Sequence, residues 1–446
     1  MNLNQIHNVY FIGIGGIGMS ALARYFKTIG KNVSGYDKTE TELTKELEAS
    51  GIAIHFEDNI RLIPEQYYIE NTLVIITPAV PITHSEWNYF IERSFQIKKR
   101  AEVLGIITKD TFCFAVAGTH GKTTTSSILG HILYQSGVDV TAFVGGIVEN
   151  YDSNLIGNGK TVTVVEADEF DRSFLHLHPD IACVTSTDAD HLDIYGDKAS
   201  IEASFQEFAN KVEDKKNLFV AKGLDLKGIT ISVNEVANFT AVNVRIENSQ
   251  YIFDVQTPTE LLTNIRFSLP GTHNLMNALM ALAMAKTYGV ATDDIRKALA
   301  SFKGIRRRFS FQIKTENVVF IDDYAHHPTE INAVNQAVRE LYPNQKVLAI
   351  FQPHLFSRTK DFADAFAESL SNFDEVILLD IYPARELPIE GITSQWILSK
   401  MTNKNVKLVS KSDLIAAILK SDAKVIVTIG AGDIGELVKP IKKALL

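Results

Sequence analysis

The sequence predicts an α/β protein built from mostly parallel sheets. Short apolar runs rich in β-branched residues alternate with helical segments from end to end, which is the pattern of βαβ units. The composition, 46% hydrophobic and 22% charged, is that of compact globular domains. A chain of 446 residues is too long for one core, and about 150 residues per domain gives about three domains.

The apolar runs that we predict to be strands share a β-rich composition and polar or Gly-rich ends. They are residues 9–12, 73–77, 112–117, 162–166, 181–185, 318–321, 347–351, 376–380 and 425–429. Domain boundaries near residues 105 and 310 give three predicted domains, 1–105, 106–310 and 311–446. Between residues 217 and 270, short strand-like pieces with little helical periodicity predict a small antiparallel excursion within the middle domain.

The net charge and the cysteines indicate which partners and which cellular compartment to expect. A net charge of -9 argues against nucleic acid, which needs clustered cations; the basic run 306–308 fits a local anion clamp or a solvated face. Cys113 and Cys183 sit in apolar runs and are expected to be buried free thiols in a reducing cytoplasm. Residues 1–9 do not resemble a secretory signal, and the apolar stretch 275–285 is too short for a bilayer.

A glycine-containing loop follows the predicted strand 112–117 and precedes a helical segment. Strand, glycine loop and helix together form a phosphate site, because backbone N–H groups and the helix N-terminus face the anion. Lys122 is expected to reach the β- and γ-phosphates of ATP, and Thr123 to hold Mg²⁺ through its hydroxyl. The spacing is two residues shorter than the common form, with Ala115 where the first glycine would stand. The expected ATP-binding residues here are Gly118, Thr119, His120, Gly121, Lys122, Thr123 and Thr124.

Acidic residues follow the next two predicted strands. Mg²⁺ that bridges phosphates prefers one or two carboxylates plus water. Glu166 and His191, with Thr123, are therefore the candidate metal ligands, while Asp168 and Asp193 are candidates for indirect contacts. The acidic and histidine residues at the carboxyl ends of the predicted strands 162–166 and 181–185 are Glu166, Asp168, Glu169, Asp171, Asp188, Asp190, His191 and Asp193.

A second glycine cluster, Gly13-Ile14-Gly15-Gly16-Ile17-Gly18, follows the strand 9–12, and Asp37 closes the next strand-like run. This pattern predicts a site for a diphosphate and a ribose. A nicotinamide dinucleotide and a UDP-sugar both carry those groups, so an NAD-linked oxidoreductase stays open as an alternative. It would show a nicotinamide-dependent absorbance change without consuming ATP.

With these motifs, the chain resembles the Mur ligases of peptidoglycan synthesis over essentially its whole length. In that family the segment like Ile12 to Ser20 binds a UDP-sugar, and the segments like 118–124 and 166–169 bind ATP and Mg²⁺; Asp190-His191 resembles the second metal position. The resemblance implies a Rossmann-like N-terminal domain, a P-loop ATPase-like central domain and a Rossmann-like C-terminal domain. The implied UDP-sugar-binding residues are Gly13, Gly15, Gly16, Gly18, Met19, Ser20, Asp37 and Thr77.

Downstream segments extend the resemblance to the adenine and γ-phosphate. His273, Asn274 and Asn277 are similar to the family's adenine-recognising residues, and their spacing places them on one side of a helix. A helix cap plus a buried asparagine is the alternative for these residues. Arg308, in a segment like the family's R-R-F, is implied to meet the γ-phosphate, and Asp322 to hold the ATP ribose.

The last segments concern the amino acid. Tyr324 and His327, in a D-D-Y-x-H-H-P segment, and His354 and Arg358, in an F-Q-P-H segment, are the implied amino-acid-binding residues. These two segments resemble the branch that uses L-alanine more than the branch that adds a tripeptide to the same sugar, which remains the second alternative. Three departures from the family's patterns concern Ser186, where relatives often have Asn, Leu355, where some carry Arg, and Lys198, which follows His191 too closely to be assigned as a carbamylated lysine.

The resemblance implies an ATP-dependent carboxylate–amine ligase. The lactyl carboxylate of UDP-N-acetylmuramate takes the γ-phosphoryl group of ATP, and the amine of L-alanine attacks the resulting acyl phosphate. A monomer or weak homodimer is expected, with no nucleic-acid or membrane partner; a non-catalytic ATP-binding module is the remaining alternative. The implied catalytic residues are Lys122, Glu166, His191, Arg308 and His327, with His354 a further candidate for orienting the amine.

Overall fold

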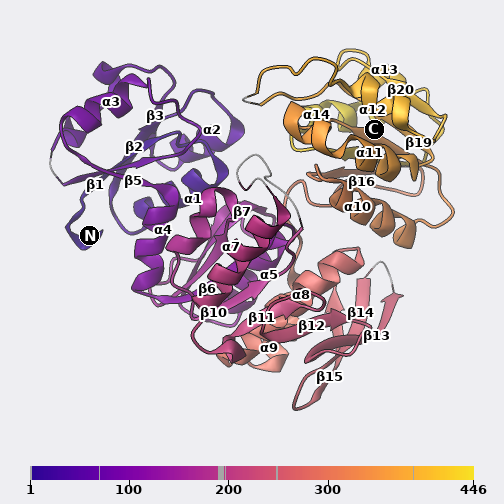
Figure 1. The fold of residues 1–446 in the computed structure, drawn as a ribbon, viewed down its shortest axis with the longest axis horizontal. Coiled ribbons are helices and arrows are strands. Elements are labelled where there is room, and N and C mark those ends of the chain that lie inside the picture. The colour runs from indigo at the N-terminus through magenta and orange to yellow at the C-terminus, as the bar shows by residue number, and fades with distance from the viewer. Residues whose placement is uncertain (1–2, 70, 189–194, 196, 248–249, 385) are drawn as a thin grey trace. The chain divides into compact units, whose positions relative to one another are not determined.

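A computed structural model describes residues 3–69, 71–188, 195, 197–247, 250–384 and 386–446 (Figure 1). The chain forms two compact units. The first unit comprises Met1–Val244, Phe253–Arg266 and Met276–Phe302, and the second comprises Arg245–Ile252, Phe267–Leu275 and Lys303–Leu446. The predicted α/β class with mostly parallel sheets is confirmed.

The N-terminal part of the first unit is a five-stranded parallel sheet with the order β3-β2-β1-β4-β5. Its central strand is buried along its whole length, as expected for a parallel sheet covered on both faces. The strand order reverses at β1, so the loop after it lies where open α/β sheets bind ligands. The strands are β1 (Asn8–Ile12), β2 (Asn32–Tyr36), β3 (Ala53–His55), β4 (Thr72–Ile76) and β5 (Gln96–Lys99); the helices are α1 (Ile17–Thr28), α2 (Glu42–Ala49), α3 (Ser85–Glu92) and α4 (Arg100–Lys109).

The second sheet has ten strands in the order β15-β14-β13-β12-β11-β10-β6-β9-β7-β8. Around β6 the strands are parallel, and β8 pairs antiparallel with β7 at one edge. The strands are β6 (Phe112–Ala117), β7 (Val140–Val148), β8 (Ser153–Ile156), β9 (Val162–Ala167), β10 (Ile181–Val184), β11 (Leu218–Ala221), β12 (Ile229–Val233), β13 (Phe239–Glu247), β14 (Gln250–Gln256) and β15 (Leu261–Phe267); the helices are α5 (Lys122–Gln135), α7 (Lys198–Asn210), α8 (Thr272–Tyr288) and α9 (Thr292–Ser301).

The predicted antiparallel excursion is wrong for its first half. Strands β11, β12 and β13 pair in parallel and extend the main sheet. Parallel neighbours usually need a helical crossover, which the sequence between residues 217 and 270 lacks. Because β11 and β12 have only four and five residues, at about 3.3 Å per residue, the short segment 222–228 spans the return without a helix.

The C-terminal sheet of the second unit has six strands in the order β16-β17-β21-β18-β19-β20. The pairing is parallel except between β16 and β17. The strands are β16 (Ser310–Lys314), β17 (Val319–Asp323), β18 (Val347–Phe351), β19 (Glu375–Leu378), β20 (Val406–Leu408) and β21 (Val425–Ile429); the helices are α10 (Pro328–Leu341), α11 (Phe356–Ser371), α12 (Ser394–Lys400), α13 (Leu414–Ile418) and α14 (Ile434–Leu445).

The predicted strands are all found, within a few residues of their expected bounds. Cys113 and Cys183 are buried free thiols, as expected. Among the described residues, no helix combines the length and hydropathy needed to cross a bilayer. The predicted boundary at residue 105 falls inside α4, and residue 310 begins β16, so the division at these positions stays a prediction.

Candidate functional site

The predicted phosphate loop joins β6 to α5. Gly118 and Gly121 have φ angles of +132° and +82°, which L side chains rarely adopt. A Cβ on Gly118 would lie 2.0 Å from the Thr185 hydroxyl, and one on Gly121 would lie 2.5 Å from the Asn277 amide oxygen. Ala115 is still inside β6, so the loop is short because the strand runs further, and its two glycines stand where the backbone requires them.

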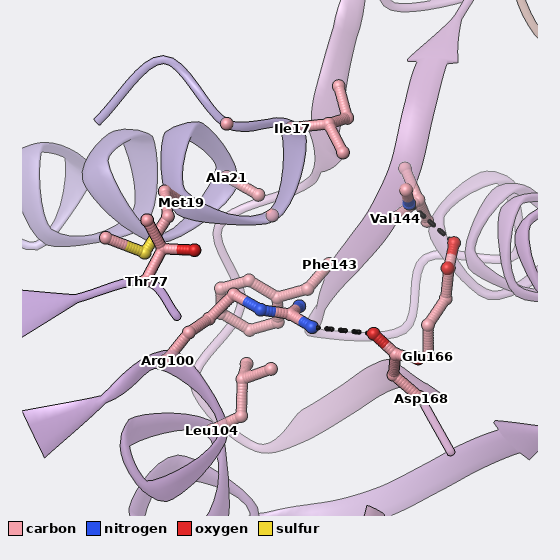
Figure 2. Close-up of a pocket in the computed structure, with 13 residues that line it drawn as sticks. Ile17, Met19, Ala21, Thr77, Arg100, Leu104, Phe143, Val144, Glu166 and Asp168 are labelled. Atoms are coloured by element: carbon pink, nitrogen blue, oxygen red, sulfur yellow. Dashed lines mark hydrogen bonds and ion pairs between the residues drawn. The ribbon is translucent and has the colours of Figure 1, made fainter. Parts of the chain in front are cut away.

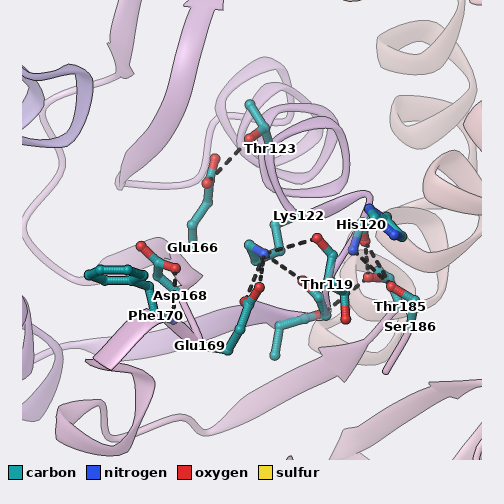
Figure 3. Close-up of polar contacts among 12 residues, drawn as sticks. Thr119, His120, Lys122, Thr123, Glu166, Asp168, Glu169, Phe170, Thr185 and Ser186 are labelled. Atoms are coloured by element: carbon teal, nitrogen blue, oxygen red, sulfur yellow. Dashed lines mark hydrogen bonds and ion pairs between the residues drawn. The ribbon is translucent and has the colours of Figure 1, made fainter. Parts of the chain in front are cut away.

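Lys122 is the first residue of α5, and its ammonium group is enclosed by the loop (Figure 3). The Nζ atom donates to the Gly118 carbonyl at 2.6 Å and to both carboxylate oxygens of Glu169, at 2.7 and 3.0 Å. Glu169 itself is buried. The contact between Lys122 and Glu169 was not predicted from the sequence, although Glu169 lies in the acidic segment 166–169 that follows β9.

The charges around Lys122 shift its titration and that of Glu169. Burial alone would lower the pKa of Lys122, but the Glu169 and Asp168 carboxylates outweigh burial and raise it. Burial raises the pKa of Glu169 against the opposing effect of Lys122. Both shifts favour the protonated forms, that of Glu169 chiefly because of burial and that of Lys122 because of the neighbouring carboxylates. Lys122 therefore keeps its positive charge in the nucleotide-free protein.

Thr123 and Glu166 lie side by side at the start of α5. The Thr123 hydroxyl donates to the Glu166 carboxylate at 3.3 Å, and the Ser126 hydroxyl donates to the same carboxylate at 3.2 Å. A hydroxyl and a carboxylate are oxygen ligands of the kind that Mg²⁺ prefers, so these two residues fit the predicted metal. The third predicted ligand, His191, lies outside the described residues, as do Asp190 and Asp193.

The end of β10 supports the phosphate loop from the side. The His120 N–H donates to the Ser186 hydroxyl at 2.8 Å, and the Thr119 N–H donates to the Ser186 carbonyl at 3.2 Å. The Thr119 hydroxyl donates to the Asp188 carbonyl at 2.9 Å. Ser186, a departure from the family's pattern, thus serves the shape of the loop.

The N-terminal glycine loop is held by its own set of contacts. Asp37 follows β2 and accepts the Gly15 N–H at 2.7 Å. Ser20 is buried in α1, where its hydroxyl donates to the Ile17 carbonyl and accepts from the Asn154 amide at 2.8 Å. Asn154, on β8, also donates to the Ile17 carbonyl at 2.7 Å. Its role in fixing α1 could not be foreseen, because nothing in its sequence surroundings indicates a contact so distant along the chain.

A pocket of about 320 Å³ connects the glycine loop with the carboxylates after β9 (Figure 2). It brings Gly16, Gly18, Met19 and Thr77, predicted for the UDP-sugar, together with Glu166, predicted for the metal. Arg100, which the sequence did not single out, pairs with Asp168 at 3.2 Å across this pocket. The pocket is lined by Gly16, Ile17, Gly18, Met19, Ala21, Thr77, Arg100, Leu104, Phe143, Val144, Gly145, Glu166 and Asp168.

The predicted adenine-recognising residues lie in the first half of α8. Asn277 accepts the Thr125 hydroxyl at 3.2 Å, and Asn274 donates to the Pro270 carbonyl at 2.7 Å. Both asparagines are buried, whereas His273 is exposed. The division between the two compact units falls between Leu275 and Met276. The role of these residues in binding adenine stays a prediction.

In the second unit, Asp322 lies at the end of β17 and is buried. It accepts the Thr428 hydroxyl at 2.8 Å and pairs with the Arg307 guanidinium at 3.3 Å. Burial raises the pKa of Asp322 against the opposing effect of Arg307. Arg307 has a φ of +62°, and its guanidinium holds the end of β17 through the ion pair with Asp322. The guanidinium of Arg308 lies 5.8 Å from the centre of the Tyr324 ring.

The residues that were predicted to bind the amino-acid substrate divide into two groups. His354 and Arg358 meet, with 3.4 Å between the His354 Nδ1 atom and the Arg358 guanidinium. His326, not predicted, lies beside them, its ring centre 6.1 Å from that of His354 and 5.4 Å from that of Tyr324. His327 instead caps α10: its Nδ1 atom accepts the Thr329 N–H at 3.3 Å. The order of the two histidines in the motif could not show which one joins the cluster.

Comparison with known families decides which family this chain belongs to. Family models described as "Mur ligase family, catalytic domain", "Mur ligase middle domain" and "Mur ligase, glutamate ligase domain" match residues 8–111, 116–285 and 307–432. The chain belongs to the Mur ligase family. The resemblance inferred from the sequence motifs is thereby confirmed.

Individual members of the Mur ligase family match over the full length. UDP-N-acetylmuramate--L-alanine ligases of Flavobacterium psychrophilum and Christiangramia forsetii are 77% and 58% identical; each alignment covers 100% of this chain and 99% of the relative. The crystal structure of a UDP-N-acetylmuramate-alanine ligase from Thermotoga maritima has 28% identity and a TM-score of 0.84, and it covers 98% of this chain and 99% of that one. A murein peptide ligase from Psychrobacter arcticus shares the fold, with 22% identity and a TM-score of 0.69 over 98% of both chains.

Proposed function

We propose that this Mur ligase joins L-alanine to the lactyl carboxylate of UDP-N-acetylmuramate and converts ATP to ADP and phosphate, in the synthesis of peptidoglycan precursors. The observation that carries the proposal is full-length identity of 77% to a UDP-N-acetylmuramate--L-alanine ligase. The enclosed Lys122 ammonium, beside a pocket that reaches the N-terminal glycine loop, supports the same chemistry.

An ATP-dependent route follows from the chemistry of the substrate. A carboxylate is a poor electrophile because its negative charge repels nucleophiles, so one of its oxygens must become a leaving group. Transfer of the γ-phosphoryl group to the lactyl carboxylate gives an acyl phosphate and ADP. The alanine amine then attacks the acyl carbon, the C–O bond to phosphate breaks, and the amine loses a proton to a base.

The residues of the phosphate loop are assigned to the first of these steps. The Lys122 ammonium compensates negative charge on the phosphoryl oxygens during transfer, as preorganised cations do in phosphoryl-transfer enzymes. Arg308, which the family resemblance implies for the γ-phosphate, is assigned the same task. Thr123 and Glu166 would hold Mg²⁺, which supplies further charge neutralisation when it is bound.

The second step needs residues that hold alanine. The Arg358 guanidinium suits the alanine carboxylate, and it lies against His354. His354 and the neighbouring His326 are candidates for taking the amine proton, because a neutral imidazole accepts a proton near neutral pH. His327, whose Nδ1 atom caps α10, is assigned to positioning that helix.

Phosphate release tests the proposal. The protein is incubated with ATP, Mg²⁺ and UDP-N-acetylmuramate, and each amino acid is added in turn. Release is expected when L-alanine is added. It is not expected when UDP-N-acetylglucosamine, which lacks the lactyl carboxylate, replaces UDP-N-acetylmuramate. A parallel arm offers a tripeptide whose N-terminal residue is L-alanine. Release with the tripeptide alone would establish the peptide ligase instead, and no release in any arm would exclude both ligases.

The setting of the reaction is also a proposal. We infer a cytoplasmic enzyme that works as a monomer or weak homodimer, without nucleic-acid or membrane partners. The two buried free thiols and the net charge of -9 support this. Sedimentation of the purified protein over a range of concentrations would contradict it by showing a stable higher oligomer.

A further inference from the structure

Arg100 is a charged residue of the pocket that neither the sequence motifs nor the proposed chemistry uses. It begins α4, directly after β5, and Figure 2 shows its guanidinium pointing at Asp168. The Nη2 atom lies 3.2 Å from the Asp168 Oδ2 atom. A Cβ on Gly18 would lie 2.7 Å from the Nη1 atom. The guanidinium therefore lies between the glycine loop and the segment after β9.

The charge balance of the pocket is unfavourable for the substrate without Arg100. Of the residues that line it, all of which the structure describes, Arg100 is the single cationic one, and it faces Glu166 and Asp168. UDP-N-acetylmuramate carries a diphosphate and a carboxylate. Desolvating these anions beside two carboxylates is costly unless a cation compensates them.

The ion pair with Asp168 is of a kind that exchanges easily. The side chains of Arg100 and Asp168 are 26% and 36% exposed. Water screens pairs with such exposure, so they contribute little to stability. A guanidinium can bind a carboxylate or a phosphate through two parallel hydrogen bonds, so the substrate is a competent replacement for Asp168.

We propose that Arg100 releases Asp168 and binds an anionic group of UDP-N-acetylmuramate when this substrate enters the pocket. Arg100 is then a substrate-binding residue, and Asp168 is its intramolecular competitor. The inference rests on the proposed function for the identity of the substrate. The anionic group is the diphosphate or the lactyl carboxylate, which share the chemistry that a guanidinium recognises.

Calorimetric binding of UDP-N-acetylmuramate to the full chain, without ATP, tests the exchange. Arg100→Met keeps the aliphatic stem of the side chain and removes its charge, and we expect the Kd to rise about ten- to a hundredfold. Asp168→Asn removes the competitor and keeps an acceptor for the Phe170 N–H, which bonds Asp168 at 3.1 Å. We expect this variant to bind the substrate as tightly as the unmodified protein or more tightly.

The unequal responses of these two variants separate exchange from a purely structural ion pair, which would lose affinity equally when either partner is removed. Arg24→Met is the matched control, because the Arg24–Glu46 pair spans 2.9 Å at a similar exposure of 18% and 32%; its Kd should stay within about twofold. Arg100→Lys keeps the charge and should recover part of the lost affinity. Thermal unfolding of each variant confirms that it is folded.

Two further ligands identify the anionic group. If Arg100→Met weakens UDP and UDP-N-acetylglucosamine as strongly as UDP-N-acetylmuramate, the guanidinium binds the diphosphate; if it weakens UDP-N-acetylmuramate alone, it binds the carboxylate. Equal losses in Arg100→Met and Asp168→Asn, or no loss in Arg100→Met, would overturn the inference while leaving the proposed function intact. If the unmodified protein neither binds UDP-N-acetylmuramate nor releases phosphate when it is supplied with ATP and L-alanine, both fail.

Discussion

The two glycine loops of the first unit both connect a strand to a helix, and they differ in the charges around them. Each follows a buried parallel strand, β1 or β6, and leads into a helix whose N-cap is a glycine without a side-chain cap. In the first loop an acid, Asp37, bonds the backbone of Gly15. In the second loop a cation, Lys122, starts the helix and is bound by Glu169.

Under the proposed function, both glycine loops bind phosphate groups, and the neighbouring side chains give the two loops different tasks. A loop held by an acid suits a diphosphate that is bound and not broken. A loop with an enclosed ammonium suits a phosphoryl group that is transferred. Variants in the two loops should therefore affect different kinetic constants.

Lys122→Met should cause the largest loss, in kcat. Removing one preorganised donor from developing charge typically lowers kcat about a hundred- to a thousandfold. The same change leaves Glu169 buried without the ammonium that compensates its charge, so the free energy of unfolding should fall by about 3 kcal/mol. Phosphate release and urea unfolding measure the two effects.

The double variant Lys122→Met/Glu169→Gln is the control for that loss. The glutamine that replaces Glu169 carries no charge, so stability should return most of the way while kcat stays low. A recovery of activity together with stability would mean that Lys122 acts on the fold and not on the phosphoryl group.

Glu166→Gln should act on the metal requirement of the second loop. Weakening an oxygen ligand lowers affinity for the cation, so activity at limiting Mg²⁺ should fall about ten- to a hundredfold and recover in part at high Mg²⁺. Ser126→Ala, which removes a hydrogen bond to Glu166 and leaves the carboxylate in place, should weaken the Mg²⁺ response less than Glu166→Gln. An unchanged Mg²⁺ titration in Glu166→Gln would remove Glu166 from the proposed ligand set.

Asp37→Ala should affect the first loop, and its effect should appear in the KM for UDP-N-acetylmuramate. Loss of the Gly15 bond loosens the loop, so the KM for UDP-N-acetylmuramate should rise about tenfold with kcat nearly unchanged. Asp37→Asn keeps an acceptor for the Gly15 N–H and should lie within about twofold of the unmodified enzyme. If asparagine is as damaging as alanine, the carboxylate charge itself acts on the substrate.

Glu86→Gln concerns the sheet beneath the first loop and should give the smallest effect, on stability alone. Burial raises the pKa of Glu86 from 4.5 to about 7, against the hydrogen bond donated by Tyr10 of β1. Below pH 4.5 the folded and unfolded chains both hold this proton; between there and about pH 7 the unfolded chain loses it first. The free energy of unfolding of the unmodified protein should therefore fall by about 1–3 kcal/mol as the pH rises over that range.

Urea unfolding at several pH values checks this slope. Glu86→Gln has no proton to lose, so its unfolding free energy should vary less between about pH 5 and pH 8. An identical slope in the variant would assign the pH dependence to other groups.

The strands and glycine loops could be predicted because local composition defines them. Apolar runs, glycines at positive φ and a lysine at a helix start all leave a mark in consecutive residues. Arg100, Asn154 and Glu169 could not be assigned in this way, because their contacts join segments far apart in the chain. The parallel pairing of β11 to β13 was missed for a related reason: pairing direction depends on how the chain returns, which strand composition does not encode.

The hydrogen bonds from Thr119 and His120 to Ser186 affect how the loop meets its nucleotide. These two amide hydrogens are bonded within the protein before ATP arrives, so they should exchange slowly with deuterated solvent even in the ligand-free enzyme. A loop that is already ordered loses little conformational entropy when it closes on phosphates. Nucleotide association should then be nearly as fast as diffusion and orientation allow, and discrimination among nucleotides should appear in their dissociation rates.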